Sequence, residues 1–157
     1  MIEVIVSVRD HILSLSDATA PGDPNWGDDL NPHHTLPAFV LTTVEIGGED
    51  RAGEGLTLIR GRFLLARLAR ENRVGQAMAD LTRVLAQLPV GARVPVRAVS
   101  ATPQGYRADG AELGRLTITR WLRLGLRRER GSPDAVAAQA EIELTGLLPP
   151  GGYGDGT

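Results

Sequence analysis

The sequence contains no cysteine and no lysine, and only 4% of its 157 residues are aromatic. Without cysteine, the chain has neither a disulfide nor a thiolate metal site. All 17 basic residues are arginine. This indicates either a GC-rich genome, which we favour, or a protein rich in interfaces, where arginine packs and pairs better than lysine. The scarcity of aromatic residues requires a core built from aliphatic side chains.

Long hydrophobic runs are also missing. No segment approaches the eighteen apolar residues that a membrane span needs, and the N-terminal segment lacks the basic start and small-residue cleavage site of a signal peptide. We therefore expect a soluble protein made inside the cell. The net charge of −2 argues against a general nucleic-acid coat. The length predicts one domain over residues 1–148, with a flexible C-terminal tail at 149–157.

The segment from Gly55 to Leu88 organises the chain, because its first half is typical of a strand and its second half of an amphipathic helix. We predict one long helix over residues 73–88, with Asn72 as its N-cap and Pro89 and Gly91 ending it. Apolar side chains recur at helical spacing on one face of this helix: Val74, Met78, Leu81, Leu85 and Leu88.

The remaining apolar segments predict strands at 36–46, 56–66, 93–100 and 115–128, and GGEDRAGEG is predicted as a polar connection between the first two. Gly61 indicates a bulge or a close backbone approach within the second of them. In the last of them, strict alternation places Leu116, Ile118, Leu122, Leu124 and Leu126 on one face.

Two segments allow both helix and strand. Residues 2–16 fit a helical face as well as an alternating strand. Residues 135–147 begin after a helix-like Ser132-Pro133-Asp134 start, but 138–145 alternate as a strand does. We favour the strand, since it can pair with 115–128 as a hairpin. The sum is an α+β fold with an antiparallel or mixed sheet of about five strands.

A long irregular stretch, residues 17–35, is either functional or disordered by its length. It contains Asp28, His33 and His34, the one cluster that suggests a metal or ligand site. Adjacent histidines on a loop point in different directions, and zinc or iron needs three or four convergent ligands. We therefore favour a solvated loop. No serine-hydrolase elbow or phosphate-binding loop is present, and we expect no catalytic residue, metal or cofactor.

Charged residues concentrate at the end of the predicted hairpin. Arg127, Arg128 and Arg130 form either a solvated turn, or a salt-bridging interface, or a contact with passing DNA. On the last strand, Glu141 and Glu143 are predicted to face outward and to pair with Arg123 or Arg127 across the hairpin. Such pairs set strand register.

This order of elements resembles that of the tail-terminator (tail-completion) proteins of long-tailed phages and of related contractile or gene-transfer particles. The segments that carry it are the strand LPAFVLTTVEIG and the strand RGRFLLARLAREN, which runs directly into the helix VGQAMADLTRVLAQL. A strand near RVPVRAVS, a variable excursion at 101–114 and a closing hairpin follow. The resemblance covers nearly the whole chain and implies that residues 2–16 are helical. The long loop at 17–35 departs from the family pattern.

The resemblance implies a structural protein, not an enzyme, that assembles into a ring of six copies. Such a ring caps the finished tail tube and meets the head-proximal connector or stopper protein, which implies a location at the head-proximal end of the tail. Two alternatives remain: another head–tail joining or tube protein of the same particle, and a small metal- or ligand-binding enzyme that uses the 28–34 loop. The residues expected at interfaces are Trp26, His33, His34, Arg107, Arg127, Arg128 and Arg130.

Overall fold

The computed structural model describes residues 1–17, 23–30, 34–51, 55–128 and 134–149. The elements in chain order are α1 (Ile2–Leu15), β1 (Trp26–Asp28), β2 (Ala38–Arg51), β3 (Leu56–Arg70), the short 3-10 helix η1 (Glu71–Arg73), α2 (Val74–Leu85), β4 (Arg93–Arg97), β5 (Ser100–Thr102), β6 (Gly105–Arg107), β7 (Glu112–Arg128) and β8 (Ala135–Leu148). Within these ranges, no helix is long and apolar enough to span a membrane.

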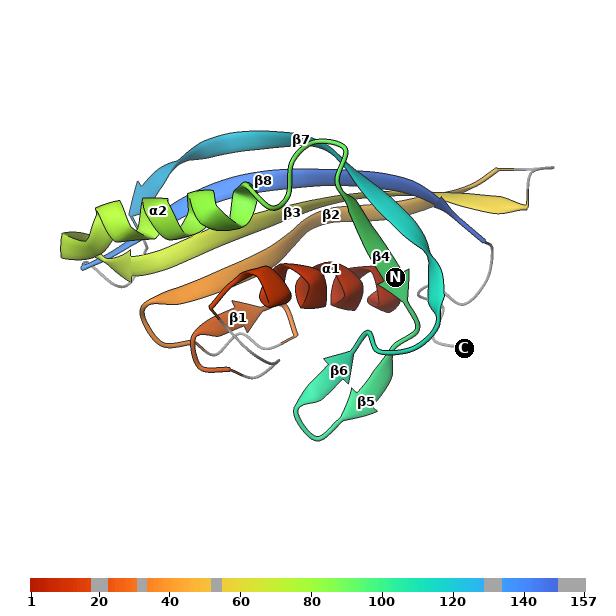
Figure 1. The fold of residues 1–157 in the computed structure, drawn as a ribbon, viewed down its shortest axis with the longest axis horizontal. Coiled ribbons are helices and arrows are strands. Elements are labelled where there is room, and N and C mark those ends of the chain that lie inside the picture. The colour runs from red at the N-terminus through yellow and green to blue at the C-terminus, as the bar shows by residue number, and fades with distance from the viewer. Residues whose placement is uncertain (18–22, 31–33, 52–54, 129–133, 150–157) are drawn as a thin grey trace.

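The described strands form one large sheet and one separate hairpin. The large sheet has six strands in the order β1-β2-β3-β8-β7-β4, and β5 pairs only with β6. Four long strands, β2, β3, β8 and β7, run antiparallel side by side, while β1 is parallel to β2 (Figure 1). The α+β class and the mixed sheet agree with the sequence prediction. The strand count does not, because the short β1 adds a sixth strand at the edge.

Both helices pack on one face of this sheet, which we call the helix face; the other is the helix-free face. Side chains from α1, α2 and the long strands form a single aliphatic cluster on the helix face. The sheet curls, so that β4 at one edge and β1 at the other flank α1 (Figure 1). A much smaller cluster, Ala66, Leu68 and Ala137 with Leu36 and Val40, lies on the helix-free face.

The N-terminal segment is a helix, as the resemblance implied. Its periodicity was ambiguous because the curled sheet buries the helix on more than one side: Val4, Val6 and Val8 are all fully buried. A helix that is apolar on several sides loses the one-sided pattern that marks a surface helix. The strand alternative for this segment is therefore wrong.

The second helix is shorter than the predicted 73–88, and its buried face is rotated. Leu81, Leu85 and Leu88 are buried as expected, but Met78 is 48% exposed. Asn72 is not the N-cap, because the chain leaves β3 through η1 and the helix begins after Arg73, with no side-chain cap. The rotation turns Ala77 and Asp80 toward the sheet instead.

The strands are longer than predicted, and bulges change which face their side chains occupy. β2 continues through residues 47–51, which the sequence suggested as a polar connection. Its bulge lies between Thr43 and Glu45, and not at Gly61, where the ring of Phe63 occupies the space that a Cβ would need.

In its pairing with β8, β7 carries two register shifts, after Ile118 and after Leu122, each with one extra residue. The first shift reverses the alternation, so Trp121 pairs with Ile142 on the helix face and Leu122 pairs with Glu141 on the helix-free face. The predicted row of five leucine and isoleucine side chains on one face of this strand is therefore wrong.

The closing hairpin is formed by β7 and β8, which confirms the strand interpretation for residues 135–147. The irregular stretch 17–35 contains β1, and the excursion at 101–114 contains the β5–β6 hairpin. Residues 150–157 of the predicted tail lie outside the described residues.

Candidate interaction surface

One side of the sheet ends at an open stretch of β7. On that side, β4 pairs with β7 from Glu112 to Thr117, and the last backbone hydrogen bonds join Ile118 to Gly91 and Ala92. On this side of β7, no described strand pairs with the residues that follow Ile118. We call residues 119–128 the arginine edge. Open strand edges carry unpaired backbone donors and acceptors, which makes them sites for pairing with another chain.

The opposite side of the sheet ends at an open stretch of β2. β1 pairs with β2 from Phe39 to Leu41, and the Asp29 carboxylate then accepts the Thr43 N–H at 2.6 Å. Past Thr43, no described strand covers β2 on this side. We call residues 44–50 the acidic edge.

The two edges carry opposite charge. The arginine edge contains four arginines and no acidic residue: Arg120, Arg123, Arg127 and Arg128. The acidic edge contains three carboxylates and no basic residue: Glu45, Glu49 and Asp50. These formal charges, +4 and −3, are partly balanced within the chain, because Arg120, Arg123, Arg128 and Glu45 each form an ion pair with a residue outside the two edges.

The arginine edge also exposes apolar side chains. Leu124 is 61% exposed and Leu126 is 52% exposed. The second bulge holds Arg123 in the left-handed region, with φ of 53°, and this conformation, together with the extra residue, keeps the edge out of the core. Exposed leucines flanked by arginines are typical of surfaces that bind another protein.

An ion-pair ladder crosses the helix-free face between the two edges. Glu45, Arg62, Glu143 and Arg120 lie in register on four neighbouring strands. Arg62 contacts Glu45 at 2.6 Å, and Arg120 contacts Glu143 at 3.1 Å. The hydrogen bond to Glu45 raises the pKa of Arg62 above its ordinary value. Because each charge has opposite neighbours, the ladder fixes the register of the four long strands.

Glu141 extends the ladder but is placed differently from the prediction. It does not face outward into solvent, since it is 1% exposed. Arg62 contacts it at 3.1 Å and Arg123 at 3.7 Å. The predicted pair with Arg123 is therefore confirmed, and Glu143 pairs with Arg120 instead of Arg123 or Arg127.

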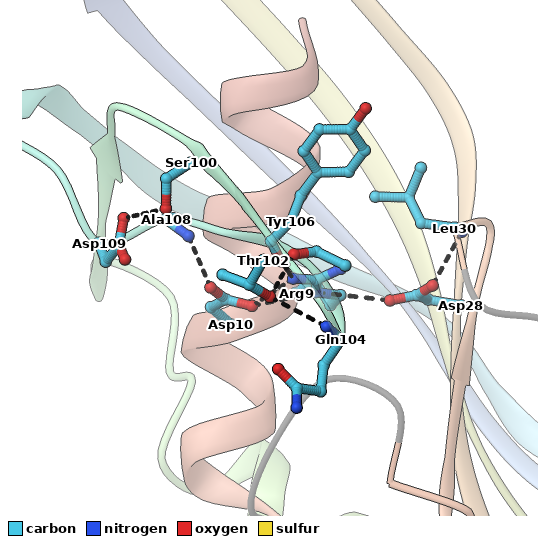
Figure 2. Close-up of polar contacts among 11 residues, drawn as sticks. Arg9, Asp10, Asp28, Leu30, Ser100, Thr102, Gln104, Tyr106, Ala108 and Asp109 are labelled. Atoms are coloured by element: carbon cyan, nitrogen blue, oxygen red, sulfur yellow. Dashed lines mark hydrogen bonds and ion pairs between the residues drawn. The ribbon is translucent and has the colours of Figure 1, made fainter.

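A buried arginine in α1 ties the β5–β6 hairpin to the core (Figure 2). The Arg9 guanidinium contacts the Asp10 carboxylate at 2.9 Å and Asp28 at 3.5 Å, and donates to the carbonyl of Tyr106. Asp10 in turn accepts the N–H of Ala108 at 2.8 Å. Arg9 is 2% exposed, so its charge is balanced by these two carboxylates and not by water.

The contact with Arg9 gives Asp28 a structural role, although the sequence suggested Asp28 as a metal or ligand residue. Its carboxylate lies against Arg9 and accepts the N–H of Leu30 at 2.8 Å. Within the described ranges, no three His, Cys, Asp or Glu side chains are grouped so as to hold a metal ion.

A second buried pair joins α2 to the sheet. Arg67 of β3 donates to the Asp80 carboxylate at 3.1 Å, and its guanidinium lies 4.4 Å from the centre of the Phe39 ring. Gln76 and Arg83 donate to the other oxygen of Asp80 at 2.8 and 3.0 Å. Both partners are buried. Sequence reasoning missed this pair, although Arg67 interrupts the apolar run LLARLA and would have signalled it.

The residues predicted for an interface are not gathered at one place. His34 is exposed and its ring lies close over Gly27. Arg107 is exposed on β6. Arg127 and Arg128 are exposed on the arginine edge, where Arg128 contacts Glu71 at 2.7 Å.

Trp26 contradicts the prediction of an interface role. It is fully buried against Phe39, with ring centres 6.1 Å apart, so its side chain offers no surface to a partner. His33 and Arg130 lie outside the described residues. The sequence therefore identified part of the arginine edge and missed the acidic edge, which it assigned to a polar connection.

Comparison with known proteins finds similarity among solved structures only. No family model matches the chain, and no curated protein matches it. Among solved structures, the chain is similar to a chain described as "Virion of native gene transfer agent (GTA) particle", with 17% sequence identity and a TM-score of 0.47. The alignment covers 94% of this chain and 92% of that one.

Proposed function

We propose that this chain is a structural subunit of a phage-like tail, and that copies of it form a ring, of six subunits, on the head-proximal end of the tail tube. The ring caps the tube and later joins it to the connector or stopper protein. Its work is assembly through complementary surfaces. No catalytic step and no cofactor are part of this function.

The observation that carries the proposal is the sheet with two different open edges on opposite sides. When one surface of a subunit meets a different surface of the next, the contact is head to tail, and a rotation that closes gives a ring. If both subunits used the same edge in the contact, a two-fold axis would relate them and they would form only a dimer.

The order of the elements supports the tail assignment. α1 precedes the long strands, β3 runs through η1 directly into α2, and β4, the β5–β6 excursion and the β7–β8 hairpin follow. This is the order in which the sequence resembles the tail-terminator proteins. The alternative of a metal- or ligand-binding enzyme loses its support, because Asp28 is engaged by Arg9 and Leu30.

The exposed arginines indicate DNA as a further partner. Three arginines are exposed to solvent in the isolated chain: Arg107, Arg127 and Arg128. Arginine side chains bind DNA phosphates without recognising the base sequence. A non-specific contact with DNA that passes through the tail is therefore part of the proposal. The tail tube protein and the connector are its protein partners.

Cryo-electron microscopy of particles that contain this chain tests the function. We expect a six-membered ring of this fold at the head-proximal end of the tube. Density for the chain repeated along the tube would instead make it a tube protein, and density in the neck beyond the tube would make it another head–tail joining protein. Density for the chain outside both the tail and the neck would refute the assignment to the tail.

A further inference from the structure

We infer that the ring interface is a continuous β-sheet, in which the arginine edge of one copy pairs with the acidic edge of the next copy. This inference rests on the proposed ring and names the two surfaces that form it. The occupant of each open edge is therefore a second copy of this chain, joined by backbone hydrogen bonds between β7 and the neighbour's β2.

The charges select this pairing over the others. Two arginine edges brought together would place four arginines against four, and two acidic edges would place three carboxylates against three. Like charges directly opposite each other on neighbouring strands are destabilising, and opposite charges are stabilising. Only the mixed pairing is complementary, and it is the pairing that links copies head to tail.

Strand direction agrees with this pairing. Within the sheet, β2, β3, β8 and β7 alternate in direction, so β7 runs opposite to β2. A neighbour related by rotation about the ring axis keeps its strand directions. Its β2 therefore lies antiparallel to β7, which places Arg127 toward the Glu45 end of the acidic edge and Arg123 toward the Glu49 end.

The stagger between the two edges fits a closed ring. The middle of the arginine edge lies level with Leu65 of β3, and the middle of the acidic edge, Gly47, lies level with Arg60. Five residues along a strand correspond to ~17 Å, and four strand spacings correspond to ~19 Å. Joining the edges therefore tilts the strands by about 40° from the ring axis, which is close to the tilt of closed β-barrels.

Charge reversal on each edge tests the inference. The first variant carries Arg123→Glu and Arg127→Glu, which lowers the formal charge of the arginine edge from +4 to 0; the second carries Glu45→Arg and Glu49→Arg, which changes the acidic edge from −3 to +1. We expect each variant alone to need at least about tenfold more protein than the wild type to assemble, because residues 123 and 127 of one copy then meet residues of the same charge at 49 and 45 of the next. An equimolar mixture should recover assembly, since alternating copies restore opposite charges at these substituted positions.

Analytical ultracentrifugation measures the assembly, and the recovery itself shows that both variants fold. The matched control, Arg73→Glu with Arg93→Glu, reverses two exposed arginines outside the edges and should assemble as the wild type does. In the wild type, hydrogen exchange of residues 119–128 and 44–50 should slow on assembly, which requires no mutation.

Several results would overturn the edge pairing. They are a wild-type chain that stays monomeric at every concentration, single variants that assemble like the control, or a mixture that fails to recover. A hexameric ring that survives both reversals would refute the edge pairing while leaving the proposed tail ring intact. The position of the chain in the particle, measured separately, tests the tail ring itself.

Discussion

The buried ion pair between Arg67 and Asp80 gives the sharpest stability prediction, because Asp80 has more additional hydrogen-bond partners than Arg67 has. When Arg67 is replaced by methionine, Asp80 keeps its hydrogen bonds from Gln76 at 2.8 Å and Arg83 at 3.0 Å. When Asp80 is replaced by leucine, Arg67 keeps only Asp17, at 3.5 Å, and the face of the Phe39 ring. Asp80→Leu should therefore cost more than Arg67→Met.

The magnitudes follow from the cost of an uncompensated buried charge. Arg67 has 6% of its side chain exposed, and removing the partner of such a group costs about 3–5 kcal/mol. Arg67→Met leaves a carboxylate that is still hydrogen-bonded, so we expect about 1–3 kcal/mol. For a chain of this size, a loss of about 4 kcal/mol lowers the melting temperature by roughly 8–16 °C.

Urea unfolding of the two single variants and of the double variant checks these values. The double variant should recover most of the loss, because an apolar pair of similar volume replaces the ion pair and leaves no buried charge. If Arg67→Met lowers the free energy of unfolding as much as Asp80→Leu does, the hydrogen bonds from Gln76 and Arg83 do not stabilise the Asp80 carboxylate. If the double variant is worse than both single variants, packing and not charge dominates the site.

Three further predictions concern single positions. Leu81→Asp should unfold the chain or lower its melting temperature severely, since an unpaired carboxylate would enter the core beneath α2; a native melting temperature would contradict the position of the helix face. Gly146→Ala should cost about 1–3 kcal/mol, because the new methyl group would overlap the carbonyl oxygen of Arg115, whereas Gly47→Ala, with open space around it, is the control in the same urea titration. Burial lowers the pKa of His11 below 6.5, so the unfolded chain binds the proton more readily and stability should fall as the pH drops through about 6.5; in His11→Leu that part of the pH dependence, measured by thermal unfolding, should disappear.

The sequence alone determined the elements whose signal is local. α2 was recognisable because its apolar side chains recur every three to four residues, and the β7–β8 hairpin was favoured because two alternating segments lie close together in the chain. The scarcity of aromatic residues predicted an aliphatic core, and the core is mostly aliphatic, with Trp26, Phe39 and Phe63 as aromatic members. These features depend only on residues close together in the chain.

Only the tertiary structure decided which strand segments lack a neighbouring strand on one side, and which face of the sheet their side chains occupy. Two bulges in β7 reverse its alternation twice, and bulges depend on the partner strand across the sheet. The acidic edge, which the sequence suggested as a connection, is a strand because β3 pairs with its residues 45–50. Arg9 and Arg67 look like ordinary charged residues in the sequence, because only the packing brings Asp28 of β1 to Arg9 and Asp80 of α2 to Arg67. The candidate interface is therefore a property of non-local pairing, which a single sequence does not display.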